Sequence, residues 1–344
     1  MTIAELPLVI QTSYAELIDQ LQLVRATQFP VGTTFRTRTI SGRDYWYAQE
    51  PTGLRGRPAE RYVGPNSPEL ASAIALAKSA KQDIEGRRAI VRSLKAAGLP
   101  EPDGITSAVI DALSLAGVFR LRSLVVGTVA FQTYGGLLGV RLPGAAIRTG
   151  DLDIAQDYGV SLAIDDAIQL PLLEILRSVD PQFAPVPSIT RREAASSYAM
   201  PGGFRVDVLT TNRGRERDGP VTLPSLKSDA APLRYLDFLL KDSIEAAVLS
   251  RSGVLVNTPA PERYAVHKLI VSTLRNRSGA SAAKAQKDIA QAGTLIEALI
   301  VKRRDEDLSI AFVEARGRGA AWRKRLSAGA ARLTDVQREM IRGL

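Results

Sequence analysis

Residues 120–128, RLRSLVVGT, contain the sharpest change of pattern in the chain. The aliphatic and β-branched run that ends at Val126 favours a strand, because such side chains pack well on a pleated surface. From Thr128 onward the apolar residues recur at helical spacing, and Gly127 separates the two patterns. We therefore predict a strand that passes into a helix at Gly127.

Acidic residues occur on two further predicted strands. Residues 151–155, DLDIA, are typical of a short strand, and Asp151 and Asp153 then share one face because strand side chains alternate. A strand predicted at 204–210 carries Asp207 between two valines. Apolar neighbours are an unusual setting for carboxylates. We expect the three aspartates to meet on adjacent strands.

The composition excludes several functional classes. The 344 residues are 45% hydrophobic and 24% charged, as in a folded globular protein. With no cysteine, the chain has no disulfide, thiolate zinc site or cysteine nucleophile, and its single histidine, His267, supports neither a metal site nor a Ser-His-Asp triad. No apolar run approaches the ~20 residues of a membrane helix, and the N-terminus lacks a basic leader. We expect a cytoplasmic protein without a membrane partner.

The formal net charge is +9. Clustered lysines and arginines attract phosphates through long-range fields, so the charge favours a nucleotide or nucleic-acid partner. A basic surface that only maintains solubility is the alternative.

The periodic patterns divide the chain into three parts. In the first part, we predict a helix at 12–28, strands at 34–38, 45–47 and 61–64, and one helix from 67 to about 97. In the second, we predict helices at 103–116 and 165–179, the strands above, a strand at 194–200 and a strand pair around 251–253. In the third, we predict helices at 261–275 and 282–304 and two or three shorter ones. The result is an α+β fold with an N-terminal helix and hairpin module (1–99), a catalytic domain (100–258) and a C-terminal helical domain (259–344).

Three clustered carboxylates suit nucleotidyl transfer. In that reaction a hydroxyl attacks the α-phosphorus of a nucleoside triphosphate, and two Mg²⁺ ions ~3.5–4 Å apart offset the accumulated negative charge. Hard cations prefer carboxylate oxygens. We therefore predict Asp151, Asp153 and Asp207 as catalytic metal ligands, with Mn²⁺ as an alternative ion.

Gly127 and Thr128 are predicted nucleotide-binding residues. Glycine lets the backbone approach a triphosphate, and a threonine at a helix start offers its hydroxyl and amides to phosphate oxygens. Taken alone, this pair is more typical of a plain strand-to-helix turn, and an isolated Asp-x-Asp is more typical of a solvated strand edge. Their occurrence together, in this order, favours the functional interpretation.

These motifs resemble those of the DNA-polymerase-β-type nucleotidyltransferase superfamily. The resemblance rests on Val126-Gly127-Thr128, Asp151-Leu152-Asp153-Ile154 and Val206-Asp207-Val208. It implies a mixed sheet with flanking helices, arranged as in polymerase β. Gly127-Thr128-x-Ala130-x-x-x-Tyr134 and Leu138-Gly139-Val140-Arg141 are further similar to a less-studied bacterial group of nucleotidyltransferase-fold proteins.

One departure from the superfamily pattern lies at 140–150, which lengthens the spacing between Thr128 and Asp151. This insertion is a basic Gly/Pro loop containing Arg141 and Arg148. We assign Arg148 to nucleotide binding, on the interpretation that the loop covers the triphosphate; a surface excursion is the alternative.

Residues 261–269, PERYAVHKL, begin a helix, and Lys287-Asp288-Ile289 follows on the next one. This pairing resembles the AbiEii and MenT toxin nucleotidyltransferases. The resemblance implies that Lys268 contacts phosphate and that Asp288 assists catalysis as a base or near the metal. A solvated helix lysine is the alternative for Lys268.

The N-terminal hairpin carries Tyr45-Trp46-Tyr47. These aromatics could stack on a base, although alternating aromatics in a hairpin usually form its packing face.

The leading functional hypothesis is transfer of a nucleoside monophosphate from ATP or another NTP to RNA, such as a tRNA end, with a toxin role opposite an antitoxin protein. Two alternatives remain. The acceptor is a small molecule of the aminoglycoside kind or a protein, or the chain is a silent nucleotide- or nucleic-acid-binding module.

Overall fold

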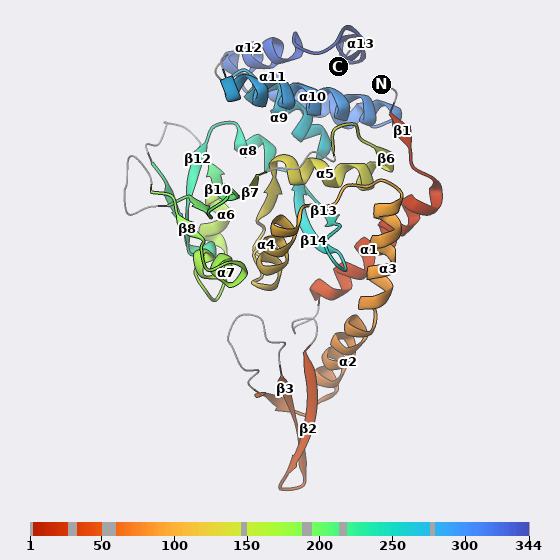
Figure 1. Cartoon of the computed structure of the whole chain (residues 1–344), viewed down its shortest axis with the longest axis vertical. Helices are drawn as coiled ribbons and strands as arrows, with labels where there is room; N and C mark the ends of the chain where they lie inside the picture. Colours follow the sequence, from red (N-terminus) through yellow and green to blue (C-terminus); the bar gives the residue numbers. More distant parts are fainter. Residues whose placement is uncertain are drawn as a thin grey trace.

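The computed structural model describes residues 3–26, 33–49, 60–145, 150–187, 195–212, 219–275 and 279–343. Within these ranges a nine-stranded mixed sheet forms the centre of the molecule. Helices cover it at one end, and a three-stranded sheet projects at the other (Figure 1). The predicted α+β class is confirmed.

The central sheet places the aspartate strands side by side. Its order is β11-β12-β10-β7-β5-β14-β13, with β9 also paired to β10 and β8 to β9. β7 pairs in parallel with β10 and antiparallel with β5. The strands are β5 (Leu124–Val126), β7 (Asp151–Gln156), β8 (Ala184–Pro185), β9 (Ser197–Ala199), β10 (Arg205–Thr211), β11 (Val221–Leu223), β12 (Ser228–Leu233), β13 (Ser243–Val248) and β14 (Val254–Pro259).

The predicted passage from strand to helix is confirmed, but the strand is shorter than expected. β5 passes directly into α5 (Gly127–Leu138), whereas residues 117–122 form turns and Arg122 has a φ of 59°. Phe119 and Leu121 in these turns are buried, so the apolar run reflects burial rather than extension.

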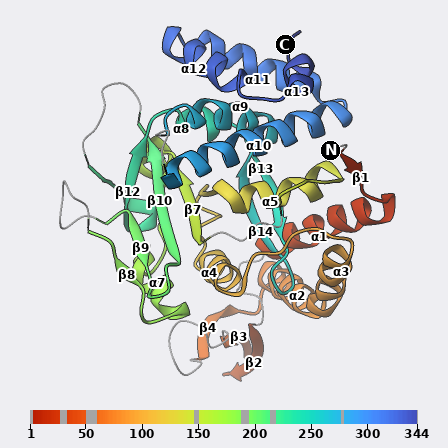
Figure 2. The same ribbon diagram turned by 45° about the horizontal axis from the view of Figure 1, so that its top comes forward.

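The C-terminal helices are confirmed in number and order. They are α9 (Pro261–Ser272), α10 (Gly279–Val301), α11 (Asp305–Gly317), α12 (Ala320–Ala330) and α13 (Asp335–Met340). Phe131 and Tyr134 of α5 share one buried cluster with Leu269 and Leu295. Figure 2 shows α10 lying across α5 and reaching β7. The C-terminal helices therefore share a core with the central sheet.

The N-terminal module contains α1 (Leu8–Ala26) and the antiparallel sheet β2 (Thr34–Ile40), β3 (Arg43–Gln49) and β4 (Glu60–Pro65). The single helix predicted from 67 to about 97 is wrong: α2 (Pro68–Gln82) and α3 (Ile84–Ala96) are separate helices. α2 packs on the three-stranded sheet, whereas α3 packs on α1. Two different packing partners thus divide one continuous helical pattern.

The helix predicted at 165–179 also needs correction. Only α7 (Leu172–Val179) is helical there, and the short α6 (Tyr158–Ala163) precedes it. Pro171 starts α7, and a residue that precedes proline is disfavoured in helical conformation. The helix α4 (Gly104–Leu115) agrees with its prediction.

The sequence patterns also missed a small antiparallel pair, β1 (Ala4–Glu5) with β6 (Val140–Arg141). This pair fixes the start of the 140–150 insertion against the N-terminal residues. No helix in the described ranges is long and apolar enough to cross a membrane.

Candidate active site

The register of β7 and β10 brings the three predicted aspartates together. Asp207 lies directly opposite Asp153, and Arg205 opposite Asp151. In-register residues of neighbouring strands, ~4.8 Å apart, point to the same face. The three carboxylates therefore share one face of the sheet, as predicted; we call them the carboxylate site.

Gly127 lies against this site because Val126 pairs with Asp153 across β5 and β7. Its φ is 65°, a conformation that side chains other than glycine rarely adopt. A Cβ atom at this position would also collide with the Asp153 carboxylate. Gly127 thus allows both the turn into α5 and the close approach of Asp153.

The environment of Asp153 disfavours its negative charge. Burial is the largest cause, and repulsion from Asp151 and Asp207 adds to it, so the pKa rises to about 6 even though Lys268 and Lys284 oppose the shift. A divalent cation would relieve this repulsion. The donor set therefore has the chemistry of a magnesium site.

Basic and polar side chains contact the other two carboxylates, those of Asp207 and Asp151. Ser197 donates to Asp207 Oδ1, and Arg205 Nε lies 3.0 Å from the same oxygen. Lys284 Nζ lies 4.0 Å from Asp151 Oδ2. Among the described residues no group of three His, Asp or Glu side chains is arranged to hold a metal ion as it stands. The metal role of the aspartates stays a prediction.

Helix α10 supplies basic residues that the sequence reasoning did not assign. Four polar residues of α10 have the spacing of one helix face: Lys284, Lys287, Asp288 and Gln291. Lys287 Nζ donates to Thr128 Oγ1 at 2.8 Å, which joins α10 to the start of α5. The i, i+3, i+4, i+7 spacing of these polar residues was the signal available in the sequence.

Lys268 and Asp288 contact each other, which the resemblance did not imply. Lys268 Nζ donates to Asp288 Oδ1 at 2.6 Å, and Arg275 Nε donates to Asp288 Oδ2 at 2.5 Å. Burial would raise the pKa of Asp288, but these two cations outweigh burial and lower it. Asp288 is thus a buried, charged acceptor that holds Lys268.

Two residues of α9, Tyr264 and His267, also lie near the Gly127 turn and Lys268. The Tyr264 hydroxyl donates to the Gly127 carbonyl at 2.8 Å and so fixes the turn against α9. His267 is buried, and burial, reinforced by Lys268, lowers its pKa to about 3. It is therefore neutral at physiological pH.

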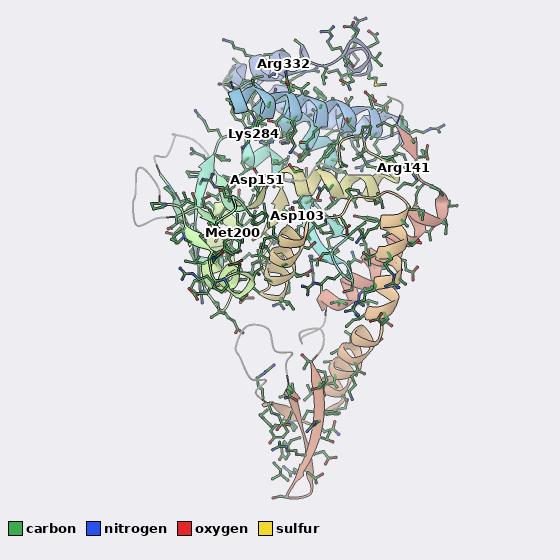
Figure 3. The ribbon with its side chains drawn as sticks, viewed as in Figure 1. Asp103, Arg141, Asp151, Met200, Lys284 and Arg332 are labelled. Atoms are coloured by element: carbon green, nitrogen blue, oxygen red, sulfur yellow. The ribbon has the colours of Figure 1, made fainter. Side chains whose placement is uncertain are left out.

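The insertion contributes little to the described site. Arg148 lies outside the described residues. Arg141 lies on β6, at the far end of α5 from Asp151, whereas Lys284 lies close to Asp151 (Figure 3).

A family model described as "Nucleotidyltransferase" matches residues 105–316. This match spans more than half of the chain and includes Gly127, the three aspartates, Lys268 and Asp288. No curated protein and no solved structure matches the chain. The chain therefore belongs to this family of nucleotidyltransferases.

Proposed function

We propose that this protein is a metal-dependent nucleotidyltransferase that transfers a nucleoside monophosphate from an NTP to an acceptor hydroxyl. One observation carries the proposal: Asp153 and Asp207 pair in register beside the Gly127 turn, with the lysines of α10 next to them. We further propose that the sheet has the polymerase-β arrangement and that the protein is related to the AbiEii and MenT enzymes.

The triphosphate would lie at the start of α5. Backbone amides at a helix N-terminus and the Thr128 hydroxyl favour phosphate oxygens. Lys287 already contacts Thr128, and Lys268 is held by Asp288. With the triphosphate in this position, both ammonium groups would stabilise the charge that develops on the leaving pyrophosphate. If the 140–150 insertion covers the nucleotide, Arg148 would add a further cation.

Mg²⁺ held by Asp151, Asp153 and Asp207, with Mn²⁺ as the alternative, would neutralise phosphate charge and activate the acceptor hydroxyl. Arg205 and Ser197 orient Asp207 through its Oδ1 oxygen. Asp288 was predicted to act as a base or near the metal. Its two cationic partners favour a positioning role, in which it orients Lys268 and leaves proton transfer to other groups.

We propose RNA, such as a tRNA end, as the acceptor, and a toxin role controlled by an antitoxin protein. The support is the net charge of +9 and the resemblance to toxin nucleotidyltransferases. The charge also suits a nucleotide alone, so the acceptor must be identified by assay.

The test is transfer of label from each of the four NTPs to total RNA in the presence of Mg²⁺. Asp151→Asn and Asp153→Asn should each lower transfer on the order of 10³-fold, because several kcal/mol of charge stabilisation is lost. A chelator should abolish transfer reversibly. Asp165→Asn, an exposed aspartate on a loop, is the matched control and should retain activity.

Parallel reactions with protein and aminoglycoside acceptors determine the substrate class. If none of these acceptors is labelled and no pyrophosphate is released, the proposed activity is wrong and a silent binding module is indicated.

A further inference from the structure

The three-stranded sheet has one covered and one open face. Alternate side chains of its strands pack on α2, in a cluster formed by Phe35, Trp46, Val63, Leu70, Ala73, Ile74 and Ala77. Trp46 therefore belongs to the packing face that the sequence suggested for the hairpin aromatics. The two flanking tyrosines do not.

The opposite face carries three tyrosines. The ring of Tyr62 lies 6.1 Å from that of Tyr45 and 5.7 Å from that of Tyr47, centroid to centroid. Tyr62 is 52% exposed, so its ring is accessible from solvent. We call this surface the tyrosine face.

Arginines border the tyrosines on the same face. Arg36 pairs across the strands with Tyr47, and Arg38 pairs with Tyr45. The Arg38 guanidinium also lies over the Tyr47 ring at 4.7 Å and forms an ion pair with Glu60. By strand alternation and register, the charged residues on this face are Arg36, Arg38 and Arg43 against Glu60, whereas Arg61 and Asp44 belong to the covered face. The tyrosine face is thus both aromatic and net positive.

We propose that the tyrosine face binds single-stranded RNA. Exposed rings on a sheet stack on unpaired bases, and neighbouring guanidiniums bind phosphates or stack in the same way. A purely apolar protein partner would not match the exposed arginines. A duplex would hide its bases from the rings.

The location suits a long acceptor. The sheet lies at the end of the molecule opposite α10 to α13 (Figure 1). Only a polymer could contact this face and the carboxylate site at once, whereas a nucleotide could not. The inference rests on the proposed function in one respect, which is that RNA is the acceptor.

The experiment measures binding of the full chain to a fluorescent single-stranded RNA by anisotropy, without NTP or Mg²⁺. The Tyr47→Ala/Tyr62→Ala variant should bind about tenfold or more weakly, because each stacked base contributes substantially. Tyr62→Phe, which keeps the ring, should bind like wild type. Duplex RNA of the same length should bind more weakly than the single strand.

Circular dichroism establishes that each variant is folded. Arg36→Ala removes a charge but no ring, and it provides a second test of RNA binding by the tyrosine face. It should weaken binding and reduce its salt dependence. Equal affinity of wild type, the double tyrosine variant and Arg36→Ala would overturn the proposal, as would tighter binding of duplex RNA.

Asp151→Asn separates this proposal from the proposed function, because it should lose transfer but bind RNA normally. If no NTP labels any acceptor yet the tyrosine variants lose RNA binding, only the proposed activity fails. If transfer to RNA occurs but the tyrosine variants bind RNA like wild type, only the proposal for the tyrosine face fails.

Discussion

The carboxylate site and the tyrosine face use charge in different ways. Beside the carboxylate site, Asp288 is a buried charge that is held by Lys268 and Arg275. On the tyrosine face, by contrast, Tyr62 and the arginines are exposed to solvent. A reaction that develops charge needs preorganised groups, whereas binding of a flexible strand tolerates mobile ones. Substitutions near the carboxylate site should therefore alter stability and turnover together, and those on the tyrosine face should alter binding alone.

The largest expected effect concerns acid stability near the carboxylate site. The pKa of His267 falls to about 3 on folding, so its contribution is complete above its ordinary value of 6.5 and is lost as pH falls through the window between them. At about pH 4.5 the loss of this contribution should lower the free energy of unfolding by about 2.5 kcal/mol relative to pH 7, while the raised pKa of Asp153 acts in the opposite direction. Urea titration of wild type and His267→Gln isolates this contribution. If the free energy of unfolding of the two proteins falls equally as the pH is lowered, the prediction is wrong.

The next effect tests the contact between Gly127 and Asp153. Gly127→Ala should lower transfer about a hundredfold, because a displacement of ~1 Å at a reacting centre has that effect. Gly202 is the matched control: its φ is 97°, but no atom lies near its missing Cβ. Both alanine variants should lose about 1–2 kcal/mol of stability from backbone strain. Similar activity of the two variants would mean that the Asp153 contact is unimportant.

A smaller effect distinguishes the two roles of Asp288. If it positions Lys268, Asp288→Asn should raise the KM for NTP about tenfold, the loss expected for ~1.4 kcal/mol of binding. The pH profile of kcat should keep its shape, and Asp288→Glu should restore part of the affinity. Loss of the acidic limb of that profile, where protonation of a base removes activity, would instead identify Asp288 as a catalytic base. Thermal melts monitor the cost of leaving Lys268 and Arg275 without their acceptor.

The smallest effect is expected on the tyrosine face. Tyr62→Ala should change the free energy of unfolding by no more than about 0.5 kcal/mol, as exposed substitutions usually do. Trp46→Ala, on the covered face of the same sheet, should destabilise much more because Trp46 packs on α2. Denaturant titration compares the two variants. Equal losses of stability would remove the distinction between the two faces.

Local sequence patterns correctly predicted the β5–α5 turn and the common face of the two aspartates at the centre of the molecule. Alternation along DLDIA predicted a shared face for Asp151 and Asp153, and the glycine between two periodicities predicted the β5–α5 turn. Both depend on residues a few positions apart, whose relative direction is set by the backbone. The family match at 105–316 agrees with this part of the interpretation.

Sequence patterns gave wrong secondary structure where burial in turns, or packing against different elements, determined the conformation. The apolar residues at 117–122 lie in buried turns, and the helical pattern from 67 to 97 divides because α2 and α3 pack on different elements. Tyr45 and Tyr47 flank Trp46 in the sequence, yet only the packing of α2 decided which face of the hairpin is covered.

The sequence by itself determined the order of the motifs, the common face of Asp151 and Asp153, and the glycine turn that precedes them, because these follow from backbone geometry. Only the tertiary structure decided that Asp207 lies opposite Asp153, that Lys284 and Lys287 face the site, and that three tyrosines cluster on the uncovered face of the small sheet. Those contacts join residues far apart in the chain. Their geometry depends on strand register and helix packing, which no local pattern encodes.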